Sequence, residues 1–114
     1  MNDKVPEDWR YAVCRILQAM HRNSITWTRS AQQRWEAESF GAHRADACQA
    51  MLVALSQPTV TGKRHDYPDE PGETWAFYFT FGSRQFYGKI CLKNNRLIVK
   101  ILSAHKPNPA ARHT

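Results

Sequence analysis

Residues 74–105, TWAFYFTFGSRQFYGKICLKNNRLIVKILSAH, alternate apolar and polar side chains over most of their length. A period of two residues is typical of strands that bury one face. Gly82-Ser83 and Asn94-Asn95 interrupt the alternation, and both pairs tolerate the positive φ angles of tight hairpin turns. The stretch therefore predicts three antiparallel strands joined by hairpins. They cover residues 74–81, 84–93 and 96–103.

The chain before this stretch predicts helices and one further strand. Apolar side chains recur every three or four residues, the period of an amphipathic helix, in the first and third of three segments. Between them, Thr28 or Ser30 can cap a second helix, which Gly41 ends. These helices are expected at about residues 7–22, 28–39 and 43–56, and a weakly alternating strand at residues 59–67. Helices followed by an antiparallel sheet define an α+β domain. We expect about three N-terminal helices packed on one face of a four-stranded antiparallel sheet.

The domain is expected to span residues 1–106, with residues 107–114 as a flexible C-terminal tail. No apolar run approaches the roughly 20 residues that span a bilayer, and no signal peptide is evident. We therefore expect a cytoplasmic protein without a membrane partner. Cys14, Cys48 and Cys91 have no CxxC spacing, which indicates buried thiols rather than a disulfide framework or a zinc site.

Charge is distributed unevenly along the chain. Residues 1–73 hold nine Lys or Arg and all ten Asp or Glu, whereas residues 74–114 hold seven Lys or Arg and no acid. The formal net charge of +6 thus arises in the C-terminal third. A basic region of this kind favours a polyanionic partner such as RNA, because each bound phosphate releases condensed counterions. The alternative is a basic surface that only aids solubility.

Alternation along the strands assigns their side chains to two faces. The apolar face, expected to meet the helices, holds Trp75, Phe77, Phe79, Phe81, Phe86, Ile90, Leu92, Leu97, Val99 and Ile101. The other face holds Ala76, Tyr78, Thr80, Tyr87, Lys89, Cys91, Lys93 and Lys100. In the strand before them, Gly62 permits a bulge, so either Lys63 and His65 or Arg64 point outward.

Phenol rings beside ammonium groups suit single-stranded RNA, whose bases stack on aromatic rings while cations follow the backbone. An ordinary solvated face is the alternative, because Tyr favours strands in general. RNA cleavage without a metal needs a base for the 2′-OH, a cation for the phosphorane charge and an acid for the leaving 5′-oxygen. Residues 74–114 lack carboxylates, so we expect no metal and no other cofactor.

The residues that could supply this chemistry lie on or near the polar face. We assign proton transfer to Tyr87 and His105, and stabilisation of the phosphate to Lys63 and Lys89. The RNA backbone would be positioned by Arg64, Arg84 and Lys106. The alternative for His105 is an idle position near an exposed terminus. The alternative for Lys63, Arg64 and His65 is a charged edge that protects a strand from aggregation.

Several short motifs resemble the MqsR family of bacterial toxins and its RelE-like relatives. They are TRSA at Thr28–Ala31, ALS at Ala54–Ser56 followed by Lys63, QFYGKI at Gln85–Ile90, and RLIV followed by SAHK at Ser103–Lys106. The resemblance implies a small endoribonuclease, an mRNA interferase, that cleaves mRNA without a metal. It also implies a cognate antitoxin as partner, and the ribosome as a further partner if cleavage requires it.

The resemblance also carries site residues onto this chain. The family uses a Lys on the first strand, which corresponds to Lys63, and a Tyr on the third, which corresponds to Tyr87. Ala76 stands where the family places a Gln, so His105 or His65 becomes the candidate for the missing proton-transfer role. The competing class is a non-catalytic protein of a phage or mobile element, either a nucleic-acid-binding module or an inhibitor.

Overall fold

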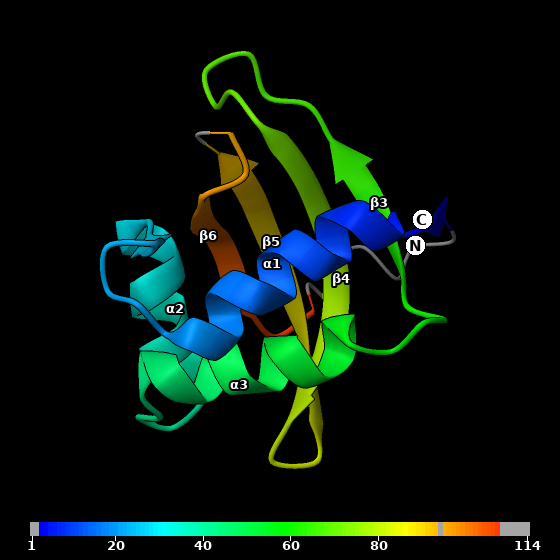
Figure 1. The fold of residues 1–114 in the computed structure, drawn as a ribbon. Helices are drawn as coiled ribbons and strands as arrows, with labels where there is room; N and C mark the ends of the chain where they lie inside the picture. The colour runs from blue at the N-terminus through cyan, green and yellow to red at the C-terminus, as the bar shows by residue number, and fades with distance from the viewer. Residues whose placement is uncertain (1–2, 94, 108–114) are drawn as a thin grey trace.

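Three helices lie against one face of a six-stranded mixed sheet in the computed structural model, which describes residues 3–93 and 95–107 (Figure 1). The helices are α1 (Glu7–Ala19), α2 (Arg29–Glu38) and α3 (Arg44–Leu55). The strands are β1 (Asp3–Lys4), β2 (Ile25–Trp27), β3 (Thr61–His65), β4 (Glu73–Phe81), β5 (Arg84–Lys93) and β6 (Ile98–His105). The predicted α+β class is confirmed.

The sheet is larger than predicted and is not wholly antiparallel. Its strand order is β1-β3-β4-β5-β6-β2, and β2 runs parallel to β6 while the other neighbours are antiparallel. The prediction of four antiparallel strands is correct for β3 to β6 and misses β1 and β2. These edge strands have two and three residues, too few to show an alternating pattern. They form by pairing with distant strands, as Thr26 does with Lys100.

Each helix begins and ends where local chemistry favours it. Helix α1 has two acids in its first turn and ends at Ala19, earlier than predicted, because Met20 adopts a left-handed φ of 54° and caps it. At the start of α2, the Thr28 hydroxyl accepts a hydrogen bond of 3.1 Å from the Ala31 N–H. His43 and Asp46 form a capping box at the start of α3.

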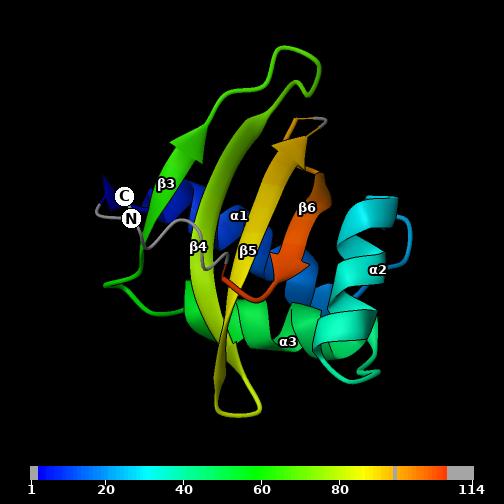
Figure 2. The same cartoon turned by 180° about the vertical axis from the view of Figure 1, so that it is seen from behind.

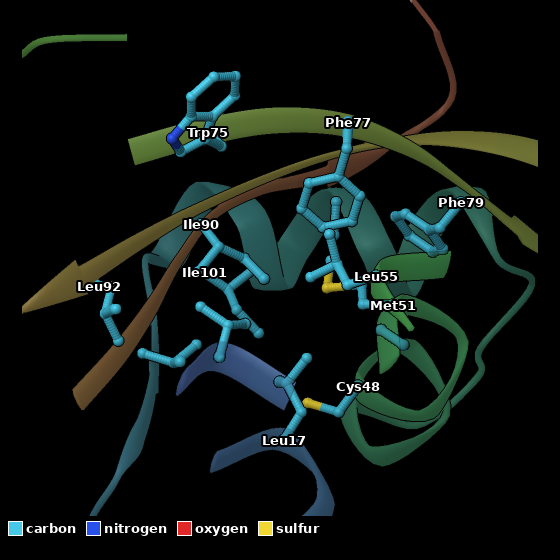
Figure 3. Close-up of a cluster of buried hydrophobic side chains, with 14 of the residues drawn as sticks. Leu17, Cys48, Met51, Leu55, Trp75, Phe77, Phe79, Ile90, Leu92 and Ile101 are labelled. Carbon is cyan, nitrogen blue, oxygen red and sulfur yellow. The ribbon is translucent and has the colours of Figure 1, made fainter. Parts of the chain in front are cut away.

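The core lies between the helices and the apolar face of the sheet (Figure 3). Helices α1 and α3 contribute Trp9, Val13, Leu17, Cys48, Met51 and Leu55, and the strands contribute Phe77, Phe79, Phe86, Ile90, Leu92, Val99 and Ile101. The predicted apolar face is therefore largely confirmed. Leu97 is the exception, because it lies in the turn before β6 and is 67% exposed.

The first hairpin turn agrees with the prediction, whereas the second is longer than predicted, because Lys93 pairs with Ile98 and β6 begins there rather than at residue 96. Gly82 and Ser83 both have positive φ angles, 59° and 66°, as a two-residue turn between β4 and β5 requires. Of the second predicted pair, Asn95 has a φ of 55°, whereas Asn94 lies outside the described residues. In the predicted C-terminal tail, residues 108–114 also lie outside the described residues.

The opposite side of the sheet carries no helix across β3 to β6 (Figure 2). We call this side the outer face. It is formed by Lys63 and His65 of β3, Thr74, Ala76 and Tyr78 of β4, Tyr87, Lys89, Cys91 and Lys93 of β5, and Lys100, Ser103 and His105 of β6. The loop between β3 and β4, residues 66–72, folds over part of it.

Candidate functional site

A β-bulge in β6 places His105 on the outer face. Lys89 pairs with Ser103 and Ile90 pairs with Ile101, so Leu102 is an extra residue with no partner in the β5 ladder. Strict alternation from buried Ile101 would point His105 toward the helices. The extra residue resets the alternation, and His105 comes to lie directly opposite Tyr87.

Tyr87 and His105 form the centre of the candidate site. Their ring centroids lie 5.2 Å apart, and the ring of Tyr78 lies 6.3 Å from that of Tyr87 on the other side. Burial raises the pKa of the Tyr87 phenol, and the nearby phenols of Tyr67 and Tyr78 raise it further. A tyrosine base would need a lowered pKa. Tyr87 is therefore suited to donate a proton or hydrogen bond, not to act as a phenolate base.

The hydrogen bonding of His105 leaves one ring nitrogen available as a base. His105 Nδ1 lies 2.7 Å from the carbonyl oxygen of Lys106. A carbonyl oxygen only accepts, so this contact assigns the proton of a neutral imidazole to Nδ1 and leaves the lone pair on Nε2. His105 and Tyr87 thus supply one proton acceptor and one proton donor side by side.

Two lysines lie beside this pair on the outer face, two residues further along the strands. In the ladder Lys63 pairs with Ala76, and Ala76 pairs with Lys89, so the two lysines flank a small buried residue. Within residues 3–93 and 95–107, neither lysine forms an ion pair with an acid. Neither ammonium charge is therefore neutralised by a carboxylate in this part of the chain.

Tyr67, which the sequence did not indicate, contacts both Lys89 and His65. Lys89 Nζ donates a hydrogen bond of 2.7 Å to the Tyr67 hydroxyl, which lies 3.3 Å from His65 Nδ1. The His65 and Tyr67 rings stack with centroids 5.8 Å apart. Burial lowers the pKa of His65, and the charges of Lys89 and Lys63 lower it further. Burial and the two lysine charges therefore favour the neutral form of His65.

The loop over residues 66–72 neutralises two other lysines of the outer face. Its Glu70 carboxylate accepts a hydrogen bond of 2.8 Å from Lys100 Nζ and pairs with Lys93 as well. Lys100 lies on the outer face as alternation predicts, but its charge is paired with a carboxylate. The loop also borders a groove of about 340 Å³ whose lining includes Tyr67, Asp69, Lys89 and Leu102.

Arg64, which is predicted to position the RNA backbone, lies on the other side of the sheet from the Tyr87–His105 pair. Arg64 pairs with Trp75 in the ladder, on the helix side, and its guanidinium contacts Asp66 at 3.2 Å and Glu73 at 3.7 Å. The alternative that the sequence left open is thus resolved, with Lys63 and His65 pointing outward. Arg64 therefore does not share the outer face with them, and its predicted role in positioning the RNA backbone stays a prediction.

Arg84 and Lys106 approach the ring of Phe40 at the end of the sheet where the turn between β4 and β5 lies. The Arg84 guanidinium carbon lies 4.9 Å, and Lys106 Nζ 5.6 Å, from the Phe40 ring centroid. The sequence reasoning also missed Phe40. Its only sequence signal is an aromatic residue next to a helix-stopping glycine, and that signal does not distinguish a site residue from a core residue.

No protein-family model, curated protein or solved structure matches the chain. The resemblance to the MqsR family therefore stays a prediction. Among residues 3–93 and 95–107, no group of three or more His, Cys, Asp or Glu side chains is arranged to hold a metal ion. The same part of the chain has no helix with the length and apolar character needed to cross a bilayer.

Proposed function

We propose that this protein is an endoribonuclease that cleaves single-stranded RNA by attack of the 2′-OH, without a metal. The observation that carries the proposal is the pairing of His105 with Tyr87 beside two lysines that have no acidic partner in the described structure. These four groups provide the acceptor, the donor and the cations that the reaction needs. Tyr78 adds a 41% exposed ring on which a base can stack.

In the proposed reaction, His105 Nε2 takes the proton of the ribose 2′-OH. The O2′ lone pair forms a bond to phosphorus while the P–O5′ bond breaks. Lys63 and Lys89 stabilise the charge on the non-bridging oxygens, and the Tyr87 hydroxyl gives its proton to the departing O5′. The products are a 2′,3′-cyclic phosphate and a 5′-hydroxyl. His105 ends with one proton more and Tyr87 with one proton fewer, so a proton must return from His105 to Tyr87 before the next cleavage.

The test is cleavage of a labelled single-stranded RNA by purified protein in excess EDTA. Replacing His105 with Ala or Tyr87 with Phe should each slow cleavage by about 100-fold or more. His21→Ala and Tyr11→Phe are matched controls, since both residues are exposed outside the outer face, and they should cleave normally. Intact RNA in the presence of protein shown by circular dichroism to be folded would refute the enzyme.

The second candidate is binding of single-stranded nucleic acid without cleavage. The arrangement of Tyr78 and Tyr87, with rings 6.3 Å apart, favours it, because such rings stack bases whether or not a bond is cut. A strand with 2′-deoxyribose tests this directly, since it lacks the attacking hydroxyl. Binding of both strands with no cut in the RNA would support the binding module.

The role of a toxin with a cognate antitoxin rests on the MqsR-like motifs and on the nuclease chemistry together. Under this proposal mRNA is the substrate, and induction of the protein in bacterial cells arrests growth. The His105→Ala variant should restore growth at equal protein level. Arrest that persists unchanged in this variant would separate toxicity from RNA cleavage and contradict the proposal.

A further inference from the structure

Phe40 is a large apolar residue in an unfavourable position. Its side chain is 78% exposed, and its φ is 60°, in the left-handed region that bulky residues rarely adopt. It follows the C-cap Ser39, and the Gly41 N–H donates a hydrogen bond of 2.9 Å to the Glu36 carbonyl, which makes a Schellman-type helix end. Glycine is the usual residue at this position. Folding therefore does not explain a phenylalanine here.

Two cations from distant parts of the chain meet at this ring. Arg84 begins β5 and Lys106 follows β6, and both place their charged groups within 6 Å of the ring centroid, at 4.9 and 5.6 Å. Neither side chain forms an ion pair with an acid within residues 3–93 and 95–107. The nearby Glu38 carboxylate accepts instead from Arg34 and from the Lys106 backbone N–H. An exposed aromatic ring with two unpaired cations is complementary to a base and its phosphate.

This cluster adjoins the proposed cleavage site. Lys106 is the residue after His105. Arg84 is three residues before Tyr87 on the same strand, a separation of roughly 10 Å, so alternation puts its side chain on the helix side of the sheet, where it pairs with Phe81. A hollow of about 210 Å³ next to the ring is bordered by Phe40, Phe81, Arg84 and Phe86. An RNA strand that occupies the Tyr87–His105 pair therefore reaches this cluster by bending around the end of β6, where Lys106 follows His105.

We propose that Phe40, Arg84 and Lys106 form a subsite for a nucleotide that flanks the cleaved bond. The base stacks on the Phe40 ring, and Arg84 and Lys106 hold its phosphate. This inference rests on the proposed function, since it assumes that RNA lies on the outer face. It assigns to the strain at Phe40 a role in binding, as is common for backbone outliers at functional sites.

The test is binding of a fluorescein-labelled, single-stranded 2′-O-methyl RNA of mixed sequence, which cannot be cut, measured by fluorescence anisotropy. Phe40→Gly should weaken binding about 5- to 100-fold while the melting temperature stays equal or rises. Arg84→Gln and Lys106→Gln should each reduce the slope of log affinity against log salt by about 0.7.

Tyr11→Ala is the matched control, because Tyr11 is 68% exposed on α1 with the Arg15 guanidinium 6.0 Å from its ring. Wild-type affinity in Phe40→Gly, or an equal loss in Tyr11→Ala, would overturn the subsite. If His105→Ala abolishes cleavage while Phe40→Gly binds normally, only the subsite fails. If wild-type protein cuts no RNA but Phe40→Gly weakens binding, the nuclease fails and the subsite stands as a binding site.

Discussion

Replacing Glu70 with Gln should destabilise the protein by loosening the loop that covers part of the outer face. The Glu70 carboxylate pairs with both Lys93 and Lys100, and the exposed fractions of the three side chains are 17%, 22% and 29%. The residues are far apart in sequence, so these contacts hold the loop over residues 66–72 against β5 and β6. Gln keeps the shape of the side chain and removes its charge.

The size of the effect follows from the partial burial of the two ion pairs. Exposed pairs contribute about 0.2–1 kcal/mol and hydrogen bonds to charged groups about 1.5–3 kcal/mol, so about 1 kcal/mol for each pair is a reasonable value. The expected loss in the free energy of unfolding is then about 2 kcal/mol. An unfolding entropy of about 2.1 cal/mol/K for each of the 114 residues converts this loss to a fall in melting temperature of about 8 °C.

The assay is thermal and urea unfolding of wild type, Glu70→Gln and the control Asp69→Asn. Asp69 is the adjacent acid of the same loop and forms no ion pair in the described structure. Hydrogen bonds from Lys100 and Lys93 lower the pKa of Glu70, so its stabilisation is present above the ordinary carboxyl pKa and is lost as pH falls through the folded-state value. The difference between wild type and Glu70→Gln should therefore begin to shrink near the ordinary carboxyl pKa of about 4.3 and vanish only below the lower folded-state value. Equal melting temperatures at pH 7 would refute this account of the loop.

Three further experiments test the close strand contact at Gly62, the ionisation of His65 and the burial of Cys48. Gly62→Ala should cost about 2–3 kcal/mol of stability in urea unfolding, because the added Cβ would lie 2.3 Å from the Ala76 carbonyl oxygen, and wild-type stability would contradict the close approach. Burial and the Lys89 charge lower the pKa of His65, so it stabilises the fold above the ordinary histidine pKa and that contribution is lost as pH falls through the folded-state value. Replacing His65 with Gln should reduce the drop in melting temperature between pH 8 and pH 5, and an undiminished drop would count against this. Burial raises the pKa of Cys48 to about 11, so iodoacetamide at pH 8 should label it only after unfolding, as peptide mass spectrometry would show.

The sequence predicts the local elements well because their signals are local. Alternation in residues 74–81 and 84–93 indicates β4 and β5, and the glycine and serine between them specify the turn. The two-residue β1 and the three-residue β2 carry no such signal. They exist because other strands leave an open edge to pair with, which is a property of the assembled sheet.

The site is predictable only as far as pairing of neighbouring strands determines it. Tyr87 and Lys89 share the outer face because they are two residues apart on β5, whereas His105 reaches that face only through the bulge at Leu102, which alternation in the sequence does not predict. The contact of Tyr67 with Lys89 depends on how a 22-residue separation closes through a loop, and no periodicity encodes that. The position of Phe40 near Arg84 likewise depends on how α2 packs against the sheet.

The bulge at Leu102 divides β6 into two halves whose side-chain orientations are determined by different contacts. The first half must keep its alternation, because Val99 and Ile101 fill the core. The second half takes its orientation from β5 alone, so deleting Leu102 would restore an unbroken ladder and leave His105 opposite Tyr87. A related chain that is one residue shorter here would keep the same geometry, although an ungapped alignment would assign its histidine to the wrong column.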